Sequence, residues 1–118
     1  MPLTIGGGWS IGPGFTATTA GATSVTVCAT ANEGSNAVMV APAGKVFTSV
    51  EFASFGTPTG TCGAFANSSC NAANSVSIVS GYLIGNSGTI NILASTGVFG
   101  DPCIGTSKRL YIQATATG

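Results

Sequence analysis

Half of the charged residues of this 118-residue chain lie in one short stretch near its C-terminus. The chain has six charged residues, and three of them, Asp101, Lys108 and Arg109, fall within nine positions together with Cys103. Ordinary soluble domains are roughly one quarter charged, whereas this chain is 5% charged. A stretch that combines an acid, a sulfur and two bases in such a chain is the clearest indication of a functional site.

Catalysis by the common side-chain combinations is disfavoured. The chain has no histidine, which excludes Ser-His-Asp and Cys-His nucleophilic sites. A glycosidase needs two opposed carboxylates. The chain offers Glu33, Glu51 and Asp101, and Glu51 lies in an alternating segment beside apolar neighbours. Gly6-Gly7-Gly8 lacks the lysine of a phosphate-binding loop. We therefore predict no enzymatic activity and no catalytic residues.

The composition also disfavours metal, nucleic-acid and membrane functions. With no histidine and no C-x-x-C motif, a zinc site is not expected, and no cofactor is predicted. The net charge is zero and no basic cluster is present, which argues against nucleic acid as a partner. No apolar run reaches the ~18 residues of a transmembrane helix.

The four cysteines indicate a protein that works outside the cell. Their even number is compatible with two disulfides in any of three pairings, among Cys28, Cys62, Cys70 and Cys103. Disulfides persist in oxidising compartments, so we expect an extracellular location. The N-terminus lacks the charged and apolar regions of a signal peptide. Removal of a leader, or release of a cytoplasmic product by lysis, would explain this combination.

The hydrophobic pattern predicts a β-rich α+β fold. Period-two alternation and β-branched residues predict strands at residues 24–28, 36–41, 45–53, 89–93 and 110–114. In the third of these we expect Val46, Val50 and Phe52 to face the core. Residues 74–83 predict a short helix, capped by Asn74 or Ser75. Together these elements predict a compact antiparallel β domain with one or two short helices, two disulfides and an extended N-terminal arm.

Residues 1–22 differ in composition from residues 23–118, and we divide the chain there. The first segment is Gly-rich and carries large apolar residues at Trp9, Ile11 and Phe15. It is either a flexible tail or an arm that binds a neighbouring subunit. The scarcity of charge favours self-association, because near-zero net charge removes electrostatic repulsion between copies.

The stretch Phe99–Leu110, F-G-D-P-C-I-G-T-S-K-R-L, resembles the rhamnose- and galactose-binding lectin domain first described in sea-urchin egg lectin. Residues 52–57, F-A-S-F-G-T, are similar to the A-N-Y-G-R motif of that family. The longer run from Phe52 to Ser75 is closer to the version appended to plant β-galactosidases. The resemblance covers residues 25–116, and residues 23–118 are thereby identified as a lectin-like domain.

The resemblance implies a disulfide pairing. The family usually has eight cysteines, and by position those of this chain match the first, third, fourth and seventh. The implied bridges are Cys28–Cys62 and Cys70–Cys103. The two missing bridges fall near Ala41 and Ala116, and near Ile84 and Ile90, so the cysteines are lost as whole pairs.

The resemblance also implies a sugar-binding site. Carried over by position, its residues are Glu33, Ser54, Phe55, Asp101 and Lys108. A carboxylate beside an ammonium group can bond the vicinal hydroxyls of a sugar, and an aromatic ring can pack on its apolar face. The chain departs from the family pattern, since Ser54 replaces asparagine, Phe55 replaces tyrosine, and residues 29–32 look inserted before Glu33.

Three functional interpretations follow. The first is a non-enzymatic structural protein of an extracellular assembly, such as a capsid decoration or tail protein of a phage virion. Its partners would be identical subunits or other virion proteins bound through the N-terminal arm, with cell-surface glycans as a further contact. The alternative is a secreted or surface lectin specific for galactose or rhamnose. The third is an accessory module of a larger enzyme. The Gly-rich arm, the absent leader and the altered sugar loop favour the virion interpretation.

Overall fold

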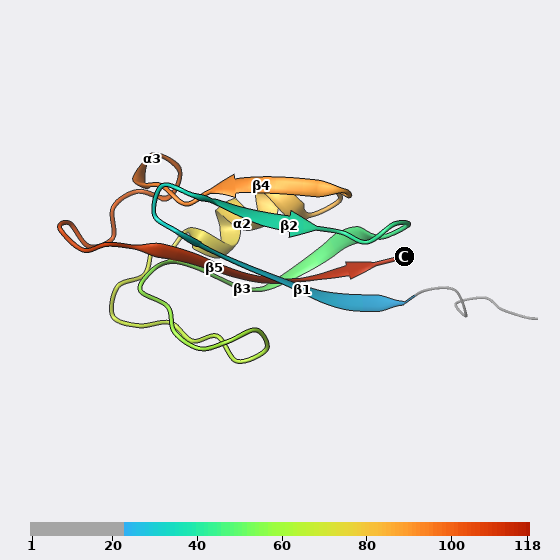
Figure 1. Ribbon diagram of the computed structural model, residues 1–118, viewed down its shortest axis with the longest axis horizontal. Coiled ribbons are helices and arrows are strands. Elements are labelled where there is room, and N and C mark those ends of the chain that lie inside the picture. Colours follow the sequence, from blue (N-terminus) through green and yellow to red (C-terminus); the bar gives the residue numbers. More distant parts are fainter. Residues whose placement is uncertain (1–22) are drawn as a thin grey trace, which may run out of the picture.

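Two antiparallel sheets and two short helices form the part of the chain that the computed structural model describes, residues 23–118 (Figure 1). The three-stranded sheet has the order β1-β5-β3, and the two-stranded sheet pairs β2 with β4. In chain order the elements are β1 (Ser24–Asn32), β2 (Asn36–Val40), β3 (Val46–Gly56), α2 (Ser75–Leu83), β4 (Thr89–Leu93), α3 (Thr96–Phe99) and β5 (Arg109–Thr117). The predicted β-rich fold with short helices and two disulfides is confirmed.

The central strand β5 organises the larger sheet. Its residues alternate between buried and half-buried along its whole length, as expected of a strand with one face on the core. The core face of β5 carries Leu110, Ile112, Ala114 and Ala116, all fully buried. Backbone bonds between Thr23 and Gly118 join the beginning of β1 to the end of β5.

The smaller sheet and α2 cover the inner face of the larger sheet. Helix α2 contacts β3 and β4, and it buries Val79 and Leu83. Strands β2 and β4 bring Met39 and Ile92 into the same core. None of the helices in residues 23–118 is long and apolar enough to cross a membrane.

The expected core face of β3 is wrong in part. Phe47 and Phe55 are fully buried, whereas Val46 is 40% exposed. Phe52 lies on the outer face of the sheet, where its ring contacts Phe65 at a centroid distance of 5.6 Å. Val50 packs against the core as expected. The cause is two register shifts in the pairing of β3 with β5, because each extra residue exchanges the two faces of the strand.

The helices also differ in detail from the sequence prediction. The helix expected at residues 74–83 is present as α2, with Asn74 at the N-cap position but without a side-chain cap bond. Ser75 instead donates its hydroxyl to the Ala72 carbonyl at 2.6 Å and accepts from the Phe55 amide. Helix α3 was not specified by the sequence pattern. It has four residues, one of them glycine, which is too short and too poor in helix formers for a periodic signal.

The long loop between β3 and α2, residues 57–74, is attached to the outer face of the larger sheet. Cys28–Cys62 ties it to β1, and Cys70–Cys103 ties it to the segment before β5, each with a Cα–Cα distance of 5.9 Å. Both pairings implied by the family resemblance are confirmed. The Arg109 Nε donates to the Pro58 carbonyl at 2.9 Å, so this arginine is a loop contact.

The residues of the predicted arm, Trp9, Ile11 and Phe15, lie outside the described residues. The division of the chain at residue 22 therefore stays a prediction.

The two disulfides should each stabilise the domain substantially. The bridged cysteines are 34 and 33 residues apart. Closing a loop of this size is worth about 3–4 kcal/mol in the chain-entropy model. We expect the double substitution Cys28→Ser with Cys62→Ser to lower the free energy of unfolding by this amount in urea titrations. A midpoint of unfolding unchanged by this substitution or by a reducing agent would contradict the pairing.

Candidate functional site

A buried ammonium group lies at the centre of the candidate site. Lys108 is 5% exposed. Its Nζ lies 3.0 Å from the Asp101 Oδ1 and 3.7 Å from the Glu33 Oε1. It also donates to the carbonyls of Cys103 at 3.2 Å and Thr106 at 2.7 Å. Asp101 and the two carbonyls account for the three hydrogens of the ammonium group.

The two carboxylates, by contrast, remain open to solvent. The side chains of Glu33 and Asp101 are 36% and 35% exposed. Each can therefore accept further hydrogen bonds from a ligand while Lys108 holds it in position. The arrangement offers fixed acceptors at the surface and keeps the cation below them.

Three chain segments meet to form this cluster. Glu33 directly follows β1, and it pairs with Lys108 in both directions: its amide donates to the Lys108 carbonyl, and its Oε1 accepts from the Lys108 amide at 3.0 Å. Asp101 comes two residues after the end of α3, directly after Gly100, which turns the chain with φ 83°. The four residues that look inserted before Glu33 are the end of β1. They pair with β5 as far as Asn32 opposite Arg109, and this pairing places Glu33 beside Lys108.

Of the five sugar-site residues predicted from the sequence, the structure brings Glu33, Asp101 and Lys108 together. The other two, Ser54 and Phe55, are neighbours on β3 and therefore point to opposite faces of the sheet. Both are fully buried. Because neither side chain is exposed, Ser54 and Phe55 can affect binding only through the residues that they support.

Each of these two residues supports a different part of the site. Phe55 stacks on Phe99 of α3, with ring centroids 5.1 Å apart. The Ser54 hydroxyl donates to the Asn71 Oδ1 at 2.7 Å. With its oxygen engaged in this bond, Asn71 presents its NH₂ group as a donor for other partners.

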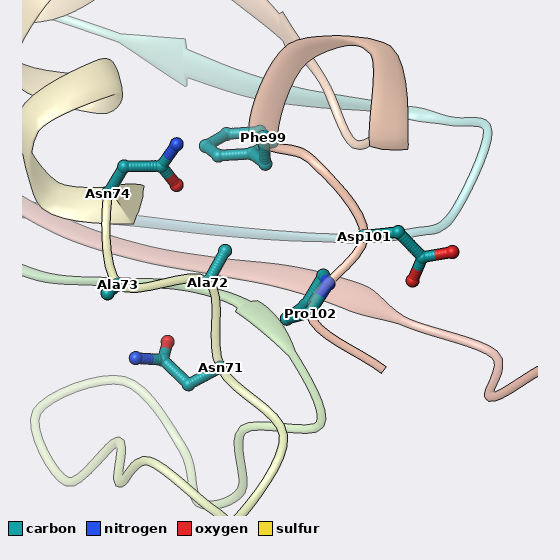
Figure 2. Close-up of a pocket in the computed structure, with 7 residues that line it drawn as sticks. All are labelled: Asn71, Ala72, Ala73, Asn74, Phe99, Asp101 and Pro102. Atoms are coloured by element: carbon teal, nitrogen blue, oxygen red, sulfur yellow. The ribbon is translucent and has the colours of Figure 1, made fainter. Parts of the chain in front are cut away.

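An open cavity of about 410 Å³ lies beside the charged cluster (Figure 2). It is lined by Asn71, Ala72, Ala73, Asn74, Phe99, Asp101 and Pro102. Figure 2 shows the Asn74 amide directed toward the ring of Phe99, and Asp101 on the far side of Pro102 from both asparagines. Asp101 is thus shared between the cavity and the Lys108 cluster.

Asn71 and Asn74 are not among the site residues predicted from the sequence. Two signals point to them in retrospect. Both lie in the run that resembles the plant version of the domain, directly after Cys70. In addition, Asn74 occupies a helix N-cap position without using its side chain as a cap, which leaves its amide free for the cavity.

A second cavity of about 410 Å³ lies between the loop at residues 60–65 and the outer face of the larger sheet. It is lined by Cys28, Ala29, Thr30, Gly60, Thr61, Cys62, Phe65 and Tyr111. The Phe65 and Tyr111 rings contact each other at 5.0 Å, and the Arg109 guanidinium covers Tyr111 at 5.5 Å. These aromatic faces are already engaged in fastening the loop. We therefore place the candidate site at the first cavity, which combines amides with a carboxylate.

The first cavity and the Lys108 cluster suit a neutral ligand with several hydroxyl groups. The carboxylates accept hydrogen bonds, the asparagine amides both donate and accept, and Pro102 offers an apolar surface. Among residues 23–118, no group of three or more acidic, histidine or cysteine side chains is placed to ligate a metal ion.

Comparison with known families identifies the class of this domain. The model of the D-galactoside/L-rhamnose binding SUEL lectin domain matches residues 39–116, which is more than half of the chain. The chain belongs to this lectin family. The match includes Asp101 and Lys108 and begins six residues after Glu33.

The individual relatives are plant proteins. The chain is 45% identical over 73 residues to β-galactosidase 8 of Arabidopsis thaliana, which covers 62% of this chain and 8% of that protein. It is 39% identical over 88 residues to β-galactosidase 3 of Oryza sativa subsp. japonica, covering 72% and 10%. β-Galactosidase 6 of the same species is 35% identical over 74 residues, covering 63% and 8%. The chain thus spans a tenth or less of these relatives, and the region matched is a lectin module.

These matches bear on the three functional interpretations. They support a lectin-like, carbohydrate-binding domain, and the disulfides of such a domain are consistent with an extracellular location. The lectin alternative therefore fits better than the virion interpretation that the sequence analysis favoured, for which neither the fold nor the relatives give support.

Removing the buried ammonium group should destabilise the domain. Lys108→Ala would leave two carboxylates and two carbonyls facing a cavity without a donor. Breaking a fully buried ion pair costs about 3–5 kcal/mol. Because both carboxylates are about one-third exposed, solvent reduces this cost. We expect Lys108→Ala to lower the free energy of unfolding by about 2–3 kcal/mol in urea titrations.

Lys45→Ala is the matched control, because the Lys45 ammonium group donates to the Thr23 hydroxyl at the domain surface. We expect this change to alter the free energy of unfolding by less than about 0.5 kcal/mol. Equal stability of the Lys108 and Lys45 variants would contradict a structural role for the ammonium group.

Proposed function

We propose that this chain is a galactose- or rhamnose-binding lectin module that works outside the cell. The observation that carries the proposal is the convergence of Glu33 and Asp101 on the buried Lys108, at the edge of an open cavity, in a chain of this lectin family. Its counterpart in longer proteins would be an accessory module that holds an enzyme on a glycan. The names of the plant β-galactosidases support this association.

In the proposed complex the two carboxylates accept hydrogen bonds from vicinal sugar hydroxyls. Lys108 acts from below: it fixes both acceptors and compensates one of their two negative charges. The remaining negative charge disfavours anionic sugars, since like charges at short range repel. Glu33 and Asp101 therefore select for neutral sugars.

The cavity completes the proposed contact. Asn71 donates through the NH₂ group that its bond to Ser54 leaves available. Asn74 adds a second amide from the start of α2, and the apolar face of the sugar lies against Pro102. Ser54 and Phe55 act as positioning residues, through Asn71 and Phe99 respectively.

Removing either exposed carboxylate should weaken sugar binding. A hydrogen bond to a charged acceptor is worth about 1.5–3 kcal/mol, so Glu33→Gln and Asp101→Asn should each raise the Kd for galactose or rhamnose about 10- to 100-fold. Isothermal titration calorimetry with free galactose and free rhamnose measures the Kd of each variant.

Glu51→Gln is the matched control, because Glu51 is an exposed carboxylate on β3 whose side chain bonds Ser49. It should bind as the unchanged protein does. Loss of affinity in all three variants, or in none of them, would refute the proposed site. So would the absence of galactose and rhamnose binding by the unchanged protein.

The arm interpretation makes a separate prediction about assembly. If Trp9, Ile11 and Phe15 bind a neighbouring subunit, the full chain forms oligomers and deletion of residues 1–20 yields a monomer. Light scattering coupled to size-exclusion chromatography distinguishes the two. A full-length monomer would refute the arm, whatever the outcome of the sugar titrations.

A further inference from the structure

The loop that connects β3 to α2 contains the tripeptide Asn67-Ser68-Ser69. An asparagine followed two positions later by serine or threonine, with any residue except proline between them, is the acceptor sequence for N-linked glycosylation. The chain has seven asparagines, and Asn67 is the one that meets this requirement. None of the residues assigned above to sugar binding belongs to the tripeptide.

The local structure presents the two reactive positions of this tripeptide to solvent. The Ser68 hydroxyl turns inward, where it bonds the Thr57 hydroxyl and accepts from the Cys70 amide at 3.4 Å. Asn67 and Ser69, on either side of it, are exposed. The acceptor amide and the hydroxyl that an oligosaccharide transferase requires therefore both lie at the surface.

The position of the loop leaves room for a bulky group. Asn67 follows the Thr59–Ala66 bridge that closes the loop onto itself. In Figure 1 the loop projects from the larger sheet on the side opposite α3 and the smaller sheet. A glycan here would extend into solvent without displacing a core residue.

The disulfides supply an independent reason to expect the modification. Two bridges bracket the tripeptide through Cys62 and Cys70, and such bridges form in the oxidising compartments of the secretory route. In eukaryotic cells N-linked glycans are added in that same compartment. The chain is 5% charged, so few charged side chains are available to keep the folded protein soluble. A bulky, hydrophilic glycan would increase its solubility.

We propose that Asn67 carries an N-linked glycan. The side-chain amide nitrogen of Asn67 forms a bond to C1 of an oligosaccharide held on a lipid pyrophosphate. The bond from C1 to the pyrophosphate oxygen breaks, the lipid pyrophosphate leaves with the electron pair, and the amide nitrogen gives up one proton. The proposal rests on the extracellular route of the proposed function, but not on the sugar-binding site itself.

The test is secretion of the full chain, behind a cleavable leader, from a eukaryotic host cell. We expect intact-protein mass spectrometry to show one glycan, which a peptide N-glycosidase removes while converting Asn67 to aspartate. Asn67→Gln and Ser69→Ala should each abolish the modification. Ser69→Thr should retain it, because threonine supplies the same hydroxyl.

Ser68→Ala is the matched control, because it removes the inward hydroxyl of the same loop but leaves the acceptor sequence intact. It should remain glycosylated. Secreted protein with both disulfides formed but no glycan would overturn the proposal, and so would a glycan that persists in Asn67→Gln or Ser69→Ala. Sugar titrations on the same preparations report separately on the proposed function.

Discussion

The burial of one lysine ammonium group links the fold of this domain to its site. Lys108 directly precedes β5, and it lies below two carboxylates, one from the residue after β1 and one from the segment after α3. A buried cation must be paired and hydrogen-bonded, or its desolvation destabilises the fold. Meeting that requirement fixes the β1–β2 turn, the loop at residues 101–107 and the end of the larger sheet in one arrangement. The two exposed acceptors of the site are a consequence of this constraint.

The chain uses most of its few charged residues to hold its loops in place. Of the six, three form the Lys108 cluster, and Arg109 fastens the loop at residues 57–70 through the Pro58 carbonyl. The disulfides add covalent long-range ties, and Cys70–Cys103 joins the segment that carries the asparagines to the segment that carries Asp101. This disulfide therefore joins the two walls of the cavity covalently. Phe55 of β3 supports both walls, because its carbonyl accepts from the Ala72 amide and its ring stacks on Phe99.

The sequence carries most of the fold but less of the site. Alternating apolar residues locate the five strands, and the spacing of the cysteines, compared with the family, gives both bridges. Which residues of β3 face the core could not be predicted in the same way. Its two register shifts arise from pairing with β5 and do not change the periodicity of the sequence. Asn71 and Asn74 were missed for a related reason. An asparagine beside a helix start is usually read as a cap, and only the tertiary structure shows that Ser75 and the Ala72 carbonyl make the local bonds instead.

The departures from the family pattern need a different interpretation once the strand geometry is known. Phe55 in place of tyrosine and Ser54 in place of asparagine suggest a weakened sugar loop when the two residues are assumed to touch the ligand. Both are instead fully buried, on opposite faces of β3. A phenylalanine at position 55 suits the apolar contact with Phe99, where a hydroxyl group would need a buried partner.

A serine at position 54 still reaches Asn71 and fixes its amide. These substitutions therefore change how the pocket is supported and leave the exposed side chains of Glu33, Asp101 and Asn74, and the half-buried Asn71, in place. The altered loop was one of the reasons for preferring a virion protein over a lectin. Because its two changed residues are buried, the loop no longer favours the virion interpretation over the lectin interpretation. The retained acceptors then count in favour of the lectin.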